Sequence, residues 1–392
     1  MIIPAAERLQ QVEEYYFSKK LKEIRSLNAQ GKDIINLGIG SPDLPPSKET
    51  VEALLKTAND SSSHGYQSYT GTPEFRGAIS KWLTKNYLID LNPSDEILPL
   101  MGSKEGIMHI SMAFLNKGDK VLVPNPGYPT YSSVSNLLQA SIEHYELDEQ
   151  NGWNIDLQQL KKLDLDAVKL MWTNFPNMPT GAEADDEVLQ ELIALARKHK
   201  FLIINDNPYS LILNKKNPFS IFQLSGAKEV CLELNSLSKS HNMAGWRVGW
   251  LTGKNDYIST ILKVKSNMDS GMFLGLQKAS IKAFENTSEW HDNQNVIYQE
   301  RKDLITEIYD LLGVSYNAKG SGMFVWGKVA DEVADVKSFV DEILYEANVF
   351  ITPGFIFGSK GDRYIRASLC AKKETIQIAL ERIKVLKSKT RS

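Results

Sequence analysis

Residues 236–239 read SLSK, and residues 245–249, a few positions further on, read GWRVG. This short stretch combines a lysine, Lys239, with the hydroxyls of Ser236 and Ser238 and the guanidinium of Arg247. A lysine that is partly desolvated keeps more of its amine neutral, and the neutral amine is the form that attacks a carbonyl carbon. Hydroxyls and a forked guanidinium are good phosphate donors. The stretch therefore predicts a reactive lysine beside a phosphate site, and the alternative is a solvated loop with a chance cluster.

Short, continuously apolar runs surround this stretch in the chain. They cover residues 121–123, 167–173, 201–204 and 230–234. Runs of this kind are typical of parallel strands that are buried on both faces. Between them, apolar residues recur at helical spacing, for example over residues 188–196. The pattern predicts an α/β fold with a mainly parallel sheet sandwiched by helices.

The pattern changes after about residue 287. We expect a long polar helix over 289–312, a strand over 323–326, a helix over 336–346, a strand over 364–368 and a final helix. This order predicts a smaller α+β domain over residues 288–392, after a large domain over 46–287. We expect residues 1–45 to form an arm that packs with the small domain.

Composition narrows the class of protein. The 392 residues are 42% hydrophobic with a formal net charge of -3, which gives no electrostatic case for nucleic acid or an anionic membrane as partner. The only two cysteines, Cys231 and Cys370, are too few for a disulfide scaffold and are expected to be buried free thiols. Without a signal-peptide pattern or a long apolar run, we expect a cytoplasmic protein.

Two more motifs precede the lysine. Asp206 ends the apolar run FLIIND, with Tyr209 close behind, and ligand-binding groups gather at the carboxyl ends of parallel strands. Gly102, Ser103 and Lys104 open a helical pattern, where free backbone amides bind phosphate. Taken singly, Asp206 could be a turn or capping residue and Ser103 a helix N-cap.

In this order, the motifs resemble those of the fold-type I pyridoxal-phosphate enzymes, specifically the class I and II aminotransferases, from about residue 35 to 383. The resemblance implies that Lys239 holds pyridoxal 5'-phosphate as a Schiff base and then acts as the general base. It implies that Asp206 keeps the pyridine nitrogen protonated and that Tyr209 bonds the ring oxygen. The phosphate would lie among the residues that the family uses for it, namely Gly102, Ser103, Lys104, Ser236, Ser238 and Arg247.

Two aromatic residues match family positions. Residues 65–76 (GYQSYTGTPEFR) resemble the segment whose tyrosine, here Tyr66, reaches the neighbouring subunit's cofactor phosphate. This implies a homodimer with shared active sites. Tyr128, in NPGYP over residues 125–129, matches the ring that stacks on the cofactor.

Residues 174–181 (NFPNMPTG) resemble the family's Asn-x-Pro-Asn-Asn-Pro-Thr-Gly but depart from it at one position. The second asparagine of the pair, which donates to the cofactor's ring oxygen, is Met178 here, and a thioether cannot donate a hydrogen bond. Either Asn174 or Asn177 bonds that oxygen, or Tyr209 does so alone.

Substrate-binding residues follow from two further matches. Residues 363–368 (RYIRAS) resemble the strand whose arginine, here Arg366, binds the substrate α-carboxylate, while strand alternation places Arg363 on the opposite face. Residues 37–42 (LGIGSP) match a loop beside that carboxylate, with Gly40 as the aligned position and Ile39 facing the substrate.

The implied reaction moves an amino group from an L-amino acid to a 2-oxo acid, with no metal. Residues 265–273 (KSNMDSGMF) resemble the interface segment of diaminopimelate- and alanine-type enzymes, so the donor is LL-diaminopimelate or a neutral or aromatic amino acid, paired with glutamate and 2-oxoglutarate. A carbon–sulfur lyase or another enzyme of the fold is the alternative. A non-enzymatic amino-acid sensor is disfavoured because the lysine is present, and a dehydrogenase because no Gly-x-Gly-x-x-Gly lies between a strand and a helix.

Overall fold

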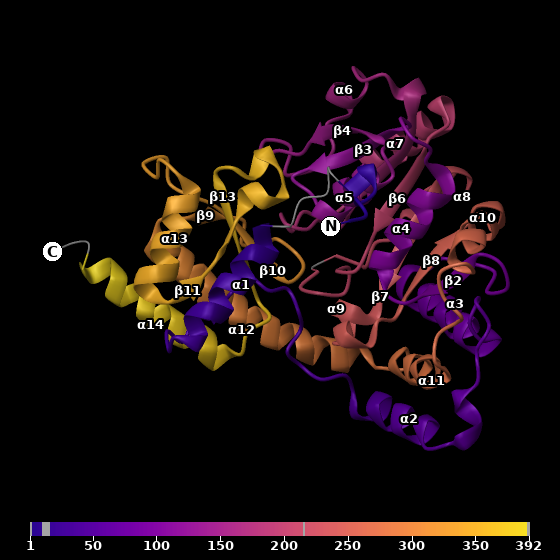
Figure 1. Cartoon of the computed structure of the whole chain (residues 1–392), viewed down its shortest axis with the longest axis horizontal. Helices are drawn as coiled ribbons and strands as arrows, with labels where there is room; N and C mark the ends of the chain where they lie inside the picture. Colours follow the sequence, from indigo (N-terminus) through magenta and orange to yellow (C-terminus); the bar gives the residue numbers. More distant parts are fainter. Residues whose placement is uncertain (1, 10–15, 215, 390–392) are drawn as a thin grey trace.

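The computed structural model describes residues 2–9, 16–214 and 216–389, and it has two lobes (Figure 1). The larger lobe contains a seven-stranded sheet, and the smaller lobe contains a four-stranded sheet. Helix α12 (Ser288–Leu312) runs from one lobe into the other. The division of the chain at residues 45 and 287 stays a prediction.

The seven-stranded sheet has the order β2-β8-β7-β6-β5-β3-β4. The pairs from β4 through β3, β5 and β6 to β7 are parallel, whereas β8 is antiparallel to β7 and β2. All four predicted apolar strands are therefore confirmed as parallel strands. The strands are β2 (Ile97–Leu100), β3 (Lys120–Asn125), β4 (Ser141–Glu146), β5 (Val168–Thr173), β6 (Leu202–Asp206), β7 (Cys231–Ser236) and β8 (Gly249–Gly253).

Helices cover both faces of this sheet because successive strand residues point to opposite sides. On β5, Leu170 and Trp172 pack in a core with α4, whereas Met171 packs in a second core with α7. The α/β prediction is thus confirmed. The helices of this region are α2 (Lys48–Ala58), α3 (Pro73–Tyr87), α4 (Ser103–Phe114), α5 (Pro129–Leu137), α6 (Leu157–Leu160), α7 (Asp186–His199), α8 (Ala227–Val230), α9 (Leu237–Ser240), α10 (Asn255–Lys265) and α11 (Leu274–Ala283).

The smaller lobe follows the predicted order of elements. Its sheet has the order β12-β13-β10-β9, all antiparallel, and α14 packs with both α12 and α13. The bounds are β9 (Ser315–Tyr316), β10 (Phe324–Lys328), α13 (Val336–Ala347), β11 (Val349–Phe350), β12 (Thr352–Pro353), β13 (Tyr364–Ser368) and α14 (Lys373–Lys389).

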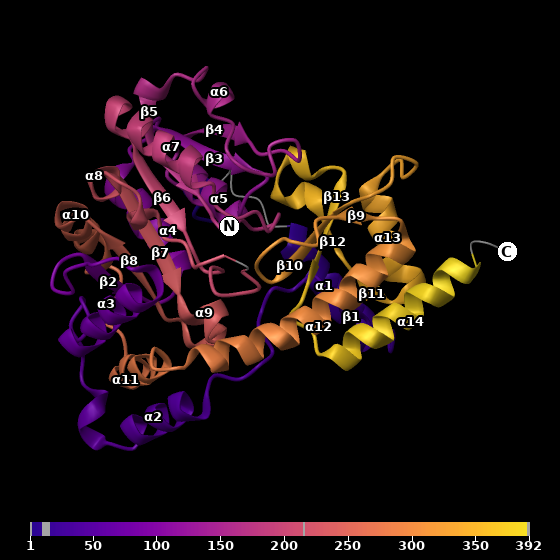
Figure 2. The same ribbon diagram turned by 180° about the vertical axis from the view of Figure 1, so that it is seen from behind.

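The N-terminal segment lies against this lobe. Helix α1 (Tyr16–Ala29) precedes β1 (Ile35–Asn36), which pairs in parallel with β11 (Figure 2). The loop after β1 is fixed by Asp43, whose carboxylate accepts two hydrogen bonds from Arg301 of α12, at 2.6 and 2.9 Å. These contacts hold the loop over the ends of the large-lobe strands.

Both cysteines are free and buried, as predicted, although Cys370 follows β13 rather than lying within a strand. Within the described residues, no helix combines the length and apolar character needed to cross a bilayer.

Replacing Asp43 with Ala is expected to lower the free energy of unfolding by about 3 kcal/mol, because the buried Arg301 guanidinium loses its charged partner. Urea denaturation measures the loss. The exposed Asp256→Ala serves as the matched control and should change stability by less than about 0.5 kcal/mol. Equal effects of the two substitutions would show that the pair contributes nothing specific.

Candidate active site

A cavity of about 350 Å³ lies at the carboxyl ends of β5, β6 and β7. Most of the residues singled out in the sequence line it, although they come from distant parts of the chain. The lining residues are Gly40, Ser103, Lys104, Ile107, Tyr128, Tyr131, Asn174, Met178, Asp206, Pro208, Tyr209, Ser236, Ser238, Lys239, Ala244, Arg247, Phe324 and Arg366.

Lys239 lies in the one-turn helix α9, which directly follows strand β7. Ser236 caps this turn by accepting a hydrogen bond from the Ser238 backbone N–H at 2.9 Å. The Lys239 amine donates to the Gly40 carbonyl at 2.5 Å. Desolvation lowers the pKa of Lys239, and the nearby charges of Arg366 and Arg247 lower it further. The lowered pKa gives Lys239 a larger share of neutral, nucleophilic amine than a solvent-exposed lysine has.

Asp206 ends strand β6 and also lines the cavity. Its Oδ2 accepts a hydrogen bond from the Tyr131 hydroxyl at 2.8 Å, whereas Oδ1 is buried and has no hydrogen-bond partner among the described residues. Burial raises the pKa of Asp206 to about 6, and the bond from Tyr131 opposes part of this rise. An unpartnered carboxylate oxygen inside a cavity is suited to a cationic N–H donor.

The N-terminus of α4 forms one end of the cavity. Gly102 precedes it with a φ of +87°, and a Cβ at that position would collide with the Arg247 guanidinium. Arg247 reaches the Ser238 hydroxyl at 3.5 Å and donates to the Ala244 carbonyl at 2.9 Å. Backbone amides, hydroxyls and a guanidinium thus converge at one place, and this donor set suits a phosphate.

Arg366 on β13 enters the cavity from the smaller lobe. Its guanidinium lies 3.9 Å from the ring centroid of Phe324 and 4.6 Å from that of Phe357. It donates to the Gly38 carbonyl at 2.9 Å and to the Met178 sulfur at 3.2 Å, while its Nε is buried without a partner among the described residues. Burial lowers the pKa of Arg366 to about 10. A carboxylate is the natural ligand of such a group.

Several residues predicted for the site lie elsewhere. Asn177 does not line the cavity, and its side-chain oxygen accepts hydrogen bonds from Thr180. Ile39 is 40% exposed and is also absent from the lining. Tyr66 is 93% exposed, away from this chain's own cavity. Arg363, as strand alternation predicted, points away and donates to the carbonyls of residues 330 and 333.

Asn174 does line the cavity, but both ends of its amide are engaged. Its nitrogen donates to the Asp206 carbonyl at 2.5 Å, and its oxygen accepts from the Met178 backbone N–H at 2.7 Å. Met178, from the same loop, also lines the cavity, and its thioether has no hydrogen-bond donor to offer there.

Sequence analysis missed Tyr131 and Phe324. Tyr131 is stacked on Trp172 with centroids 5.0 Å apart and directs its hydroxyl at Asp206. Its spacing of three residues from Tyr128, at the start of a Pro-initiated helix, places both rings on one side of that helix and could have signalled it. Phe324 carries no comparable signal, because its position under Arg366 comes from the pairing of β10 with β13.

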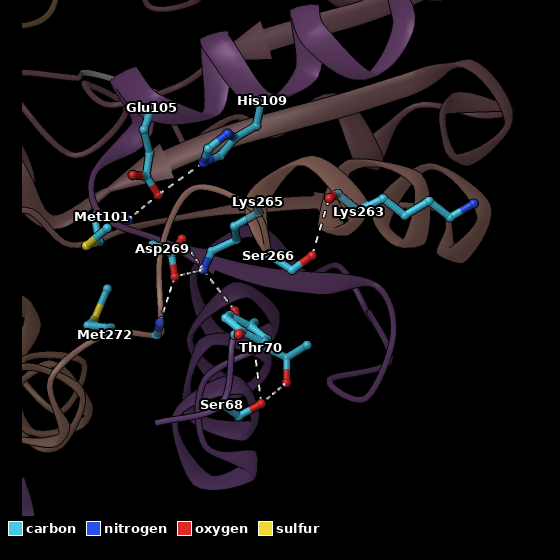
Figure 3. A network of polar contacts seen from close by, with 12 residues as sticks. Ser68, Thr70, Met101, Glu105, His109, Lys263, Lys265, Ser266, Asp269 and Met272 are labelled. Carbon is cyan, nitrogen blue, oxygen red and sulfur yellow. Dashed lines mark hydrogen bonds and ion pairs between the residues drawn. The ribbon is translucent and has the colours of Figure 1, made fainter. Parts of the chain in front are cut away.

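Figure 3 shows the polar contacts of Lys265 and Asp269, which lie near Glu105 and His109 of α4 and reach the loop that carries Tyr66. Lys265 donates to the Tyr69 carbonyl at 2.9 Å and lies 2.8 Å from Asp269. Glu105, His109 and Asp269 place potential metal-ligand atoms within 4.8 Å of one another, but the buried ammonium of Lys265 already supplies a cation there. The expected absence of a metal stays a prediction.

The sheet, the lysine on a turn after a strand and the donor-rich helix N-terminus together define a fold-type I enzyme. The model of the family "Aminotransferase class I and II" matches residues 32–383. The chain belongs to this family, and the predicted resemblance is confirmed.

Curated relatives and solved structures support the same family assignment. LL-diaminopimelate aminotransferases of Dehalococcoides mccartyi and Moorella thermoacetica are 37% and 38% identical to the chain, covering 96% and 97% of it and 97% of each relative. The solved structure of substrate-bound BacF from Bacillus subtilis has a TM-score of 0.94 and 33% identity, and the match covers 98% of both chains. The protein is therefore an enzyme that catalyses transamination, acting on amino and oxo acids.

Asp206→Asn is expected to stabilise the cofactor-free protein at pH 7 by up to about 3 kcal/mol. The folded-state pKa of Asp206 is raised above the unfolded value. The contribution of the protonated carboxyl to folding stability is therefore complete below about pH 4 and is lost as the pH rises through 6. The difference between variant and wild type should therefore vanish near pH 4. Thermal melts at both pH values measure it, with the exposed Asp90→Asn as control. A pH-independent difference would contradict the assignment.

Proposed function

We propose that the protein is a pyridoxal-phosphate-dependent aminotransferase in which Lys239 carries the cofactor. One observation carries this proposal: the desolvated Lys239 amine and the unpartnered oxygen of Asp206 line the same cavity. A lysine nucleophile and a carboxylate for a pyridinium nitrogen are the two groups that this cofactor requires.

The remaining lining also fits the cofactor. Ser103 at the N-terminus of α4, with Ser236, Ser238 and Arg247, would bind its phosphate. Gly102 keeps the space in front of Arg247 open, and Lys104 adds positive charge at the same end. Tyr128, edge-on to Tyr131 at 5.6 Å, would cover one face of the ring. One N–H of the Asn174 amide is bonded to the Asp206 carbonyl, so we assign the bond to the ring oxygen to the Tyr209 hydroxyl, with the second N–H of Asn174 as the alternative donor.

When bound, the cofactor supplies an electron sink for the bond broken at the substrate Cα. The Lys239 amine would take the proton from that Cα and deliver it to the C4' carbon of the cofactor, and its lowered pKa favours this role as a base. Arg366 binds the substrate α-carboxylate, and its unpartnered Nε gives it an unused donor for that purpose. The Asp206 carboxylate, whose second oxygen is fixed by Tyr131, holds the ring nitrogen protonated.

We also propose a homodimer with shared active sites. Tyr66 is exposed, and the loops around it present further exposed apolar side chains, namely Tyr69, Met101 and Met268. Buried bonds of Lys265 and Asp269 hold these loops in place (Figure 3). A fixed loop with an exposed aromatic tip is suited to insertion into a second copy of the chain.

The names of the relatives make LL-diaminopimelate one candidate donor, and a neutral or aromatic amino acid is the other, each with glutamate and 2-oxoglutarate as the exchanging pair. Either candidate donor is consistent with a role in amino-acid biosynthesis. A cytoplasmic location, expected from the sequence, is part of the same proposal.

Lys239→Ala tests the role of the lysine. We expect turnover to fall at least about 10³-fold, because the variant loses both the attachment point and the base. After borohydride reduction, mass spectrometry should find the cofactor's mass on the wild-type peptide and none on the variant. The exposed Lys48→Ala is the matched control and should behave as the wild type. Wild-type turnover in Lys239→Ala would overturn the proposal.

Met178→Asn tests the altered loop. The new amide donates a hydrogen bond that the thioether cannot, which favours the anionic form of the ring oxygen. We expect the pH midpoint of the bound cofactor's visible absorption to fall by about one unit. Met178→Leu, which adds no donor, should leave the midpoint unchanged. Equal shifts in the two variants would show that position 178 acts only through packing.

A further inference from the structure

Asn125 ends strand β3, shortly before the cavity-lining Tyr128, and its side chain is buried. The amide nitrogen of Asn125 donates to the Ser359 hydroxyl at 2.8 Å and to the Glu146 carboxylate at 3.1 Å. Its amide oxygen accepts a hydrogen bond from the Lys360 backbone N–H at 3.2 Å. Ser359 and Lys360 lie between β12 and β13 of the smaller lobe, so the Asn125 side chain joins the two lobes.

The turn that receives these bonds, residues 357–360, approaches the end of β3 closely. The Gly127 backbone N–H donates to the Phe357 carbonyl at 2.8 Å. Gly358 has a φ of +129°, and a Cβ at that position would collide with the Asn125 side-chain oxygen. A glycine is therefore required for this approach, and polar contacts on either side of it fix the turn against the larger lobe.

The same turn supports Arg366 in the cavity. The Phe357 ring is buried, and its centroid lies 4.6 Å from the Arg366 guanidinium. Strand β12, which leads into the turn, pairs with β13 so that Thr352 is opposite Arg366. Because a guanidinium is attracted to an aromatic face, a displaced turn would also displace part of the support of Arg366.

The lobes also meet at contacts that do not involve Asn125. Trp153, from the loop after β4, packs edge-on against Tyr364 at 5.0 Å and against Trp326 at 6.0 Å. The Tyr364 hydroxyl donates to the Glu149 carboxylate at 3.1 Å. These contacts remain when Asn125 is replaced, so the loss of its hydrogen bonds should loosen the turn without separating the lobes.

We propose that Asn125 is a positioning residue for transamination. Through the turn that it binds, it fixes Arg366, the ligand of the α-carboxylate, relative to Tyr128, which covers the cofactor ring. A substrate held by its carboxylate reacts fastest when its Cα is aligned with the Lys239 amine, and a misplacement of about 1 Å can cost about 10²-fold in rate. This inference rests on the proposed function, from which it takes the roles of Arg366 and Tyr128.

The first experiment measures kcat and KM of the cofactor-loaded Asn125→Ala variant, with phenylalanine, alanine or LL-diaminopimelate as donor and 2-oxoglutarate as acceptor. For the donor that the wild type uses best, we expect kcat to fall at least about 10-fold and KM to change less than about 3-fold. The reason is that Arg366 still binds the carboxylate but holds the Cα less well aligned. The exposed Asn255→Ala, which loses a surface hydrogen bond to Asp95, is the matched control with unchanged kcat.

The outcomes of this experiment separate the two proposals. A folded, cofactor-loaded Asn125→Ala variant with the kcat of the wild type overturns the inference and leaves the proposed function intact. The absence of transamination by the wild type with every donor contradicts the proposed function itself.

Ser359→Ala tests the bond between the lobes at an exposed position, where the substitution should not prevent folding. We expect kcat to fall about 3-fold or more. The double variant of Asn125→Ala and Ser359→Ala should be no slower than Asn125→Ala, because both changes remove the same bond. Ser259→Ala, on the exposed side of α10, is the matched control. Losses that multiply fully in the double variant would show independent effects and would overturn the inference.

Visible circular dichroism of the bound cofactor separates positioning from a loss of stability. The amplitude of its band depends on how the neighbouring side chains hold the ring. We expect Asn125→Ala to change this amplitude more than Ser359→Ala does, and neither control variant to change it. A variant with a lowered melting temperature but the band and the kcat of the wild type would have a structural role only, which overturns the inference.

Discussion

The constraint on which the site depends is an excess of positive charge in a partly closed cavity. Lys104, Lys239, Arg247 and Arg366 line it, whereas Asp206 is the single acidic residue among the described lining. Without bound anions this group of cations is electrostatically unfavourable, because each desolvated positive charge raises the free energy of keeping its neighbours charged. Burial lowers the pKa of both Lys239 and Arg366, and the charges of Arg366 and Arg247 lower the pKa of Lys239 further. A phosphate at one end and a carboxylate at the other relieve this repulsion.

The rest of the fold keeps these charges apart and in place. Lys239 is positioned by the turn after β7, Asp206 by the end of β6 and Arg366 by β13 of the smaller lobe. The N-terminal loop joins the set through the Gly38 and Gly40 carbonyls, which accept hydrogen bonds from Arg366 and Lys239. Both carbonyls are neutral acceptors. A ligand that binds Arg366 or Lys239 must therefore compete with the hydrogen bond that this side chain already makes to the loop. The Asp43–Arg301 pair anchors the loop that makes these bonds.

Much of this could be predicted from the sequence because the residues concerned follow local rules. Parallel strands show as continuous apolar runs, and a reactive lysine among hydroxyls shows as SLSK, so β5, β6, β7 and Lys239 were found without coordinates. Tyr131 and Phe324 were missed because their roles arise from the packing of separate elements. The side-chain oxygen of Asn177 is bonded within the turn by Thr180, which the motif alone does not reveal, and its contact with the cofactor stays a prediction.

Met178 shows how one substitution within a motif affects two functions at once. Its sulfur accepts a hydrogen bond from Arg366, and its side chain lines the cavity of Lys239. An asparagine there could donate a hydrogen bond to the ring oxygen, whereas the thioether has no donor. The thioether is polarisable and flexible, so it can pack against aromatic rings while it still contacts the guanidinium. The departure from the family motif thus removes a donor to the ring oxygen and gives Arg366 a polarisable neighbour in its place.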